Sequence, residues 1–258
     1  MAARRIFRGL TDMHCHVLPG VDDGPKTMDE TEAALKEAVS QGISTMIVTP
    51  HYHPDRYMVS SEQIGHALTS VRRMCAEKGI RITLLPGQEC LWHSDLVEVL
   101  NTGRALTLNG TRYVLVEFMP WTIFRDIFDA VSILGMNGYI PIIAHFERYE
   151  CLLKRTDRLS ELKNAGALLQ LNFDRLLDKE TLFRKNSWKK LLQDGYVDFL
   201  GSDTHGTHFR PLHVQEALET VSASVDLEIL DRVMSDHIRL LKGISNISGD
   251  RQKPAVIK

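Results

Sequence analysis

The sequence predicts an α/β protein in which parallel strands and crossover helices alternate to form a barrel. Three observations support this prediction. Short apolar runs rich in β-branched residues alternate with longer segments of helical periodicity. Most of the helical segments end in a glycine just before the next apolar run. Ionisable side chains follow nearly every apolar run, at the strand ends where β/α barrels carry their functional groups.

Seven apolar runs have the length and composition of buried strands. Each is short, and most are bounded by glycine or polar residues. The expected strands are Leu10–His14, Ile43–Thr49, Ile82–Gln88, Tyr113–Phe118, Ile140–Ala144, Ala167–Asn172 and Val197–Ser202.

The first crossover helix is expected in residues 28–42, between the first two strands. Its Ala34, Leu35, Ala38 and Val39 form one apolar stripe, and Gly42 suits a helix C-cap. The same pattern predicts helices in residues 60–79, 124–138 and 158–166, each ending in glycine. Beyond Asp203 the chain is expected to form a loop and then helix to about Leu241.

Length and composition indicate a single domain spanning residues 1–258. The chain is 43% hydrophobic and 25% charged, which is typical of a globular protein with an ample core. Barrels of β/α units commonly use about 250 residues as one domain, and no linker or low-complexity stretch divides this one. A short tail from about residue 248 is expected to be poorly ordered.

Charge and hydropathy exclude several classes of function. The formal net charge is −2, and no block of like charge suggests binding to nucleic acid. No signal peptide or run of about 18 apolar residues is present, so membrane insertion is not expected. The cysteines Cys15, Cys75, Cys90 and Cys151 show no paired spacing, which favours a reducing cytoplasm.

A pair of histidines closes the first strand. Because strand side chains alternate between faces, His14 and His16 project the same way and Cys15 the opposite way. Two imidazoles so placed can bind one metal ion. By itself the pair is as compatible with a structural role as with a metal site.

Potential metal ligands recur after the other strands. In a β/α barrel these positions converge on one face, and ionisable groups at buried strand ends are costly unless they are paired or bind metal. The residues concerned are His51, Glu89, Glu117, His145, Asp203 and His205. Their recurrence favours a metal site at the carboxyl ends of the strands.

The loop after the first strand adds two carboxylates, Asp22 and Asp23. Asp23 could be a metal ligand above the same face. The Asp-Gly pair also suits a simple turn, and spacing alone leaves both roles open.

The segments HCHVLPGVDDG, TPH, AHFERY and SDTH, with a Glu after the third strand, resemble the PHP superfamily of phosphoesterases. Within it, the chain is similar to the manganese-dependent tyrosine phosphatases linked to bacterial capsule and exopolysaccharide regulation. The resemblance covers residues 10–212, and it implies a distorted seven-stranded (β/α)7 TIM-like barrel with three divalent metal ions. The ions would be manganese, with iron or zinc as alternatives, because imidazole and carboxylate ligands accept all three.

Carried over by position, the resemblance implies three groups of ligands. His14, His16, Glu89 and Asp203 would bind one ion. Glu89 would bridge to a second ion held also by Glu117 and His145, and the third ion would be bound by Asp23, His51 and His205. Relatives outside the phosphatase branch often have histidine where this chain has Glu117 and Asp23.

The resemblance also implies that Arg148 and Arg210 bind the phosphate, since a phosphomonoester needs cationic donors at oxygens that metals do not hold. Without the family, a surface pairing of Arg148 with Glu147 or Glu150 is the simpler interpretation. Two departures from the branch are Phe146, where proline is usual, and Cys90, where an aliphatic residue is usual.

The predicted function is therefore hydrolysis of phosphotyrosine on proteins, by a metal-bridging hydroxide that attacks phosphorus in line. The resemblance implies that the substrate is an autophosphorylating bacterial tyrosine kinase of polysaccharide synthesis. Alternatives are another PHP phosphoesterase such as a histidinol-phosphate phosphatase, an amidohydrolase, or a catalytically silent metal-binding regulatory module. No general acid is assigned, and the oligomeric state is left open.

One motif points to a different chemistry. Cys75 and Arg81 match the CxxxxxR spacing of cysteine-dependent tyrosine phosphatases. Such a site needs a thiol of lowered pKa and free backbone amides around phosphate, whereas Cys75 falls late in a helical segment and Glu77 would repel the anion. We therefore expect no catalytic role for Cys75.

Overall fold

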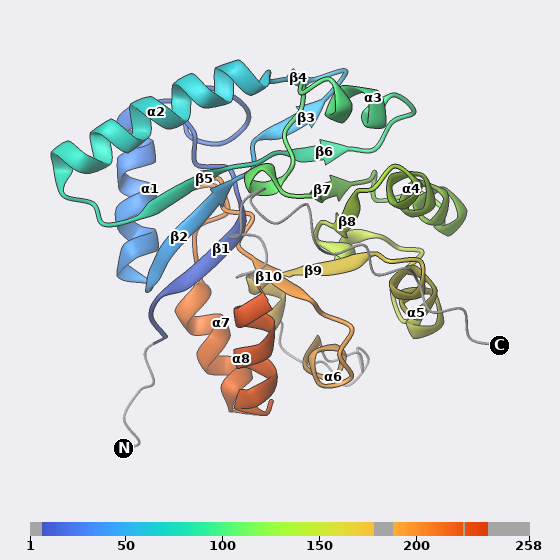
Figure 1. Cartoon of the computed structure of the whole chain (residues 1–258). Coiled ribbons are helices and arrows are strands. Elements are labelled where there is room, and N and C mark those ends of the chain that lie inside the picture. The colour runs from blue at the N-terminus through green and yellow to red at the C-terminus, as the bar shows by residue number, and fades with distance from the viewer. Residues whose placement is uncertain (1–6, 178–187, 224, 237–258) are drawn as a thin grey trace, which may run out of the picture.

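The computed structural model describes residues 7–177, 188–223 and 225–236. Its centre is a set of strands that pair in parallel, except for the β3–β4 pair, with helices packed around the outside (Figure 1). Hydrogen bonding joins the strands in the orders β1-β2-β5 and β10-β9-β8-β7-β6-β3-β4. Their bounds are β1 Leu10–Cys15, β2 Ile43–Val48, β3 His51–His53, β4 Tyr57–Met58, β5 Thr83–Pro86, β6 Glu89–Leu91, β7 Tyr113–Glu117, β8 Ile140–Ile143, β9 Leu168–Asn172 and β10 Phe199–Gly201.

The second and third predicted strands, present as β2 and β5, are each followed after a bend by a further short strand that was not predicted. β2 continues as β3 after Pro50, which has no N–H to donate to a ladder. β5 continues as β6 after Gly87, where a Cβ atom would lie only 2.8 Å from Leu108 Cδ2. Both pieces pair in parallel, β2 with β5 and β3 with β6. Seven of the ten strands thus lie in the seven predicted runs, and β3, β4 and β6 lie outside them.

The first and last strands meet through a few hydrogen bonds. The amide of Asp203 donates to His14 O (2.8 Å), and the amide of His16 donates to Thr204 O (2.8 Å). The buried carboxylate of Asp12 accepts from both the amide (2.9 Å) and the hydroxyl (2.5 Å) of Ser202. These contacts bring β10 against β1, as a distorted seven-stranded β/α barrel requires, and the order of strands and crossover helices agrees with the predicted fold class.

Helices cover the outside of this barrel. In Figure 1, α1 and α2 lie beside β2 and β5, α4 and α5 beside β8 and β9, and α7 and α8 below β10. The predicted crossover helices are present within two residues of the expected bounds. The bounds are α1 Met28–Ser40, α2 Ser61–Lys78, α3 Leu96–Asn101, α4 Phe124–Met136, α5 Thr156–Asn164, α6 Trp188–Gln193, α7 Val214–Ser222 and α8 Leu227–Asp236.

Local sequence explains where the longest helix begins and ends. The Ser60 hydroxyl accepts from the amide of Gln63, and the Gln63 side-chain oxygen accepts from the amide of Ser60, forming a capping box before α2. Gly79 ends the helix in the left-handed region at φ 66°. None of the helices among the described residues combines the length and apolarity needed to cross a membrane. The predicted tail from about residue 248 lies outside the described residues.

The barrel interior has an apolar floor below a polar layer. Ile47, Leu115, Ile142 and Phe199 are fully buried and belong to one apolar cluster inside the strands. A second and larger cluster fills the space between strands and helices. Because strand side chains alternate with period two, residues further along the same inward faces continue upward from this floor. That upper layer is polar.

Candidate metal centre

The nine predicted metal ligands converge in this upper layer, at the carboxyl ends of the strands. They come from β1, β3, β6 and β7 and from the loops after β1, β8 and β10. Eight of them fall into three groups whose ligand atoms all lie within 4.8 Å of one another. The groups are His14, His16, Glu89 and Asp203; His51, Glu89 and Glu117; and His16, Asp23, His51 and His205.

The first group surrounds one point deep in the barrel. The Nε2 atoms of His14 and His16 are 3.2 Å apart, and each is 3.2 Å from Glu89 Oε2. Asp203 Oδ1 lies 3.5 Å from His14 Nε2 and 3.4 Å from His16 Nε2. All four residues are buried. Two imidazoles and two carboxylates from three separate segments therefore face one another.

The second and third groups share His51. Its Nδ1 lies 3.2 Å from Glu89 Oε2 and 3.1 Å from Glu117 Oε1, whereas its Nε2 lies 3.5 Å from Asp23 Oδ1. His205 Nε2 completes the third group at 3.2 Å from the same Asp23 oxygen. One imidazole thus faces both groups through its two ring nitrogens.

The grouping differs in part from the predicted one. His145 Nε2 lies 2.7 Å from Glu89 Oε1 and 3.8 Å from Glu117 Oε2, but it falls outside the three groups of mutually close atoms. His16 and His51 each belong to two groups instead of one. Sequence position identifies which strand end carries a side chain, but the direction of each imidazole depends on contacts across the barrel.

The loop after β1 separates the roles of its two aspartates. Asp22 accepts a hydrogen bond from His16 Nδ1 (2.8 Å) and another from the amide of His51 (3.1 Å). It therefore orients one imidazole, while Asp23 faces the third group. Gly24 permits this turn, because a Cβ atom there would lie 2.3 Å from the carbonyl oxygen of His16.

Three residues of the site have left-handed backbone conformations that non-glycine residues rarely adopt. They are His145 (φ 30°), Asp203 (φ 52°) and Arg210 (φ 50°), each in a loop that follows a strand. Such conformations cost on the order of 1–3 kcal/mol each and persist only where surrounding contacts fix them. Their concentration at one end of the barrel is typical of a functional site.

Electrostatics keep the carboxyl groups ionised. Burial opposes ionisation of Glu89, but the charges of His14 and His145 hold its pKa well below the ordinary value. Burial also opposes ionisation of Asp203, but His14 and Arg148 lower its pKa. A carboxylate binds cations in this ionised state.

The arrangement of ligand atoms fits divalent metal ions. Glu89 Oε2, His51 Nδ1 and Asp23 Oδ1 are buried, and none has a hydrogen-bond partner. Buried polar atoms without a partner are costly in free energy. These three atoms belong to the groups described above, and imidazole and carboxylate are common ligands of divalent cations.

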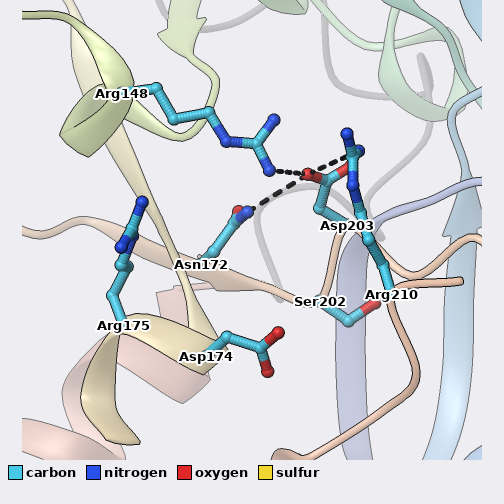
Figure 2. A pocket seen from close by; sticks show the side chains of 7 residues that line it. All are labelled: Arg148, Asn172, Asp174, Arg175, Ser202, Asp203 and Arg210. Carbon is cyan, nitrogen blue, oxygen red and sulfur yellow. Dashed lines mark hydrogen bonds and ion pairs between the residues drawn. The ribbon is translucent and has the colours of Figure 1, made fainter. Parts of the chain in front are cut away.

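A pocket of about 250 Å³ opens beside the metal groups (Figure 2). Arg148 forms an ion pair with Asp203 Oδ2, and Arg210 Nη1 lies 3.4 Å from the same oxygen. Arg148 therefore faces the site, and the simpler interpretation of a surface pair with Glu147 or Glu150 was wrong. Both predicted phosphate-binding arginines line this pocket, together with Asn172, Asp174, Arg175, Ser202 and Asp203.

Sequence reasoning missed the residues that hold the ligands. Gln170 and Asn172 on β9 contact His14, His145 and Asp203 through side-chain hydrogen bonds. Period-two alternation places both on the inward face of β9. Amide side chains there could have been noticed, since a buried amide needs partners.

The two departures from the resembled family leave the ligands in place. Phe146 is buried and packs edge-on against Trp188, with ring centroids 6.3 Å apart. Cys90 is fully buried in the outer apolar cluster, where it acts as a small apolar residue. Neither side chain belongs to a ligand group.

Cys75 lies inside α2 and is almost fully buried. Burial, and after it the charge of Glu32, raises the pKa of its thiol. A nucleophilic cysteine needs the opposite shift. The structure thus agrees with the expectation that the CxxxxxR spacing is accidental.

Comparisons with known proteins agree with the geometry. A family model described as "Capsular polysaccharide synthesis, CpsB/CapC" matches residues 10–241. The chain is 31% identical to tyrosine-protein phosphatase CpsB of Streptococcus agalactiae, over 82% of this chain and 89% of that protein. It is 30% identical to tyrosine-protein phosphatase YwqE of Bacillus subtilis, over 96% and 97% of the two chains.

A solved structure has the same fold. It comes from work on YwqE from Bacillus subtilis and CpsB from Streptococcus pneumoniae, described as unique metal-dependent tyrosine phosphatases. The TM-score is 0.81 at 28% identity, and the match covers 91% of this chain and 95% of that one. Similarity therefore extends over nearly the whole fold that carries the candidate site.

Proposed function

This chain belongs to the CpsB/CapC family, and from that membership we propose how its site works and on what it acts. It is a metal-dependent tyrosine-protein phosphatase, as its relatives are. The observation that carries the proposal is the convergence of four carboxylates and five imidazoles at one end of the barrel, beside two arginines. The nine side chains would hold three divalent ions, with manganese as the physiological metal.

Bound divalent ions would lower the pKa of water and neutralise phosphate charge, which is the chemistry that phosphomonoester hydrolysis needs. The protein's own part is to position the substrate. Arg148 and Arg210 approach Asp203 from the pocket side, so their remaining N–H groups can bind the phosphate oxygens that face away from the ligand groups. Neutralisation of these oxygens stabilises the charge of the transition state.

The substrate we propose is phosphotyrosine on an autophosphorylating tyrosine kinase of polysaccharide synthesis. The family description links the chain to capsular polysaccharide synthesis, and the relatives are named as tyrosine-protein phosphatases. A tyrosyl leaving group has a pKa of about 10, so its departure depends little on a general acid. The four free cysteines support a reducing compartment and therefore a cytoplasmic location.

Initial rates on two substrates at equal concentration test the substrate class. With manganese present, we expect kcat/KM for a phosphotyrosine peptide to exceed that for histidinol phosphate at least about tenfold, or ~1.4 kcal/mol. The opposite preference would indicate a histidinol-phosphate phosphatase. A manganese-loaded protein that hydrolyses neither would indicate a silent metal-binding module.

A further inference from the structure

Strand β9 supplies none of the predicted ligands, yet it carries two buried amide side chains into the polar layer. Leu168, Gln170 and Asn172 follow one another on its inward face, from the apolar floor upward. Gln170 is fully buried and Asn172 is 6% exposed. A buried amide is costly unless its donors and acceptor are satisfied, so the partners of these two residues are informative.

The oxygen of Gln170 contacts two predicted ligands at once. It accepts a hydrogen bond from the backbone amide of His145 (2.8 Å) and lies 2.9 Å from His14 Nδ1. Because a backbone N–H can only donate, the amide oxygen must face His145, and the orientation of the Gln170 side chain is fixed. His14 must then donate from Nδ1, so the neutral ring that a metal ion requires has its lone pair on Nε2, which lies 3.2 Å from Glu89 Oε2.

The nitrogen of Gln170 extends the contact to a third ligand. It donates to Asn172 Oδ1 (2.9 Å), and Asn172 Nδ2 donates in turn to Asp203 Oδ2 (3.2 Å). That bond and the Arg148 ion pair hold Asp203 Oδ2 on the pocket side. Asp203 Oδ1 is therefore left to face the first ligand group. In the series of hydrogen bonds that leads from His14 through Gln170 and Asn172 to Asp203, every donor therefore faces an acceptor.

Two of the residues held in this way have costly backbone conformations. His145 and Asp203 both have positive φ values, as described above. Gln170 holds the backbone of His145, and through Asn172 it also restrains the side chain of Asp203. Contacts of this kind are what allow a strained ligand loop to persist.

The barrel leaves space for this amide at one glycine. A Cβ atom on Gly201 of β10 would lie 2.8 Å from His14 Cβ and 3.0 Å from Gln170 Nε2. Only a residue without a side chain lets β10 approach both groups so closely. Three strands are thus shaped around the Gln170 side chain.

We propose that Gln170, acting through Asn172, is a positioning residue that fixes the proton of His14 on Nδ1 and links ligands from β1, β8 and β10 into one rigid metal centre. The inference rests on the proposed metal centre but on no particular substrate. Groups that orient metal ligands in this way typically change metal affinity 10–100-fold when they are removed.

Manganese titration of metal-stripped protein by calorimetry tests the proposal. We expect Gln170→Leu to raise the Kd of the tightest manganese about 10–100-fold. Gln170→Glu restores the acceptor for His14 and His145 but not the donor to Asn172. It should therefore recover part of that loss, which a purely structural effect would not do. The matched control is Gln215→Leu, since the side chain of Gln215 hydrogen-bonds Phe7 and Gln41 at the opposite end of the barrel. Its manganese affinity should equal that of the wild type.

A second measurement needs no variant. In NMR spectra of zinc-loaded wild-type protein labelled with ¹⁵N-histidine, we expect His14 to carry its proton on Nδ1 and the metal on Nε2. A proton on Nε2 would overturn the proposal, and so would a Gln170→Leu variant that binds manganese like the wild type. Neither measurement uses a substrate. A protein that binds manganese but does not hydrolyse phosphotyrosine would therefore contradict the proposed function and leave this inference intact.

Discussion

Glu89 is the residue that connects the ligand groups. Its Oε2 lies 3.2 Å from nitrogens of His14, His16 and His51, and its Oε1 lies 2.7 Å from His145 Nε2. No other carboxylate among the described residues approaches four imidazoles so closely. The charge of this one side chain therefore holds most of the site together.

We predict that Glu89→Gln lowers kcat more than about 100-fold, because the amide keeps the shape of the side chain but not its charge. Initial rates with a phosphotyrosine peptide and metal analysis of the purified variant check this. The control is Glu98→Gln, since Glu98 pairs with Arg104 on the surface. A Glu89→Gln variant with at least half the wild-type rate would exclude a bridging role.

Cys75→Ser should behave in the opposite way. Its thiol is buried in α2 and its pKa is raised, so it has no nucleophilic thiolate to lose at neutral pH. We expect kcat/KM to stay within about twofold of the wild type, less than ~0.5 kcal/mol. A Cys75→Ser variant that retains its metal but loses turnover would revive the cysteine mechanism.

At this scale, sequence reasoning identified positions better than contacts. Residue type and strand-end placement pointed to eight of the nine predicted ligands, because barrel topology brings those ends together whatever the local detail. The ninth, Asp23, lies in a loop, and its role was predicted from the family resemblance. Residue type and placement could not show that Asp22 accepts a hydrogen bond from His16, nor that His51 belongs to two ligand groups. Those roles depend on side-chain directions set by residues far apart in the chain.

Among the elements, β1 and β10 are joined by an isolated bridge between Cys15 and Thr204 and not by a regular ladder. Asp12 and Ser202 meet there below the ligands, and burial raises the pKa of the Asp12 carboxyl although bonds from Ser202 oppose the shift. The Ser202 hydroxyl also lies beside His14 O (3.2 Å). One side chain thus helps to join the first strand to the last.

Ser202→Ala should therefore destabilise the whole fold. Removing the hydroxyl leaves the buried Asp12 oxygen with one partner fewer, at a cost of about 1–3 kcal/mol. Urea unfolding measures the free energy. Ser132→Ala is the control, because Ser132 is half-buried on α4 and its hydroxyl donates to the helix carbonyl of Phe128, so we expect a smaller loss. Equal losses in the two variants would show that Asp12 does not depend on Ser202.

Secondary structure was predictable where it is regular. The crossover helices follow from apolar stripes and terminal glycines, and the strands from buried β-branched runs. The bends after β2 and β5 and the short β3–β4 hairpin were not predicted. Strands of two or three residues carry too little periodicity, and they exist because neighbouring strands pair with them.

For the whole molecule, the account depends on distant segments meeting at one end of a barrel. The ligands span residues 14 to 205, so no local segment can form the site without the complete fold. Binding of divalent ions should then stabilise the folded protein by mass action, by about 2.7 kcal/mol at an ion concentration 100 times Kd. The fold and the centre are therefore expected to form together.

Anomalous X-ray diffraction from crystals of the manganese-loaded protein tests this most directly. The account predicts three manganese peaks within the cluster, with Glu89 bound to two of them and the remaining ligands drawn from the nine predicted side chains. Manganese found only at other sites, or no manganese at this end of the barrel, would contradict it.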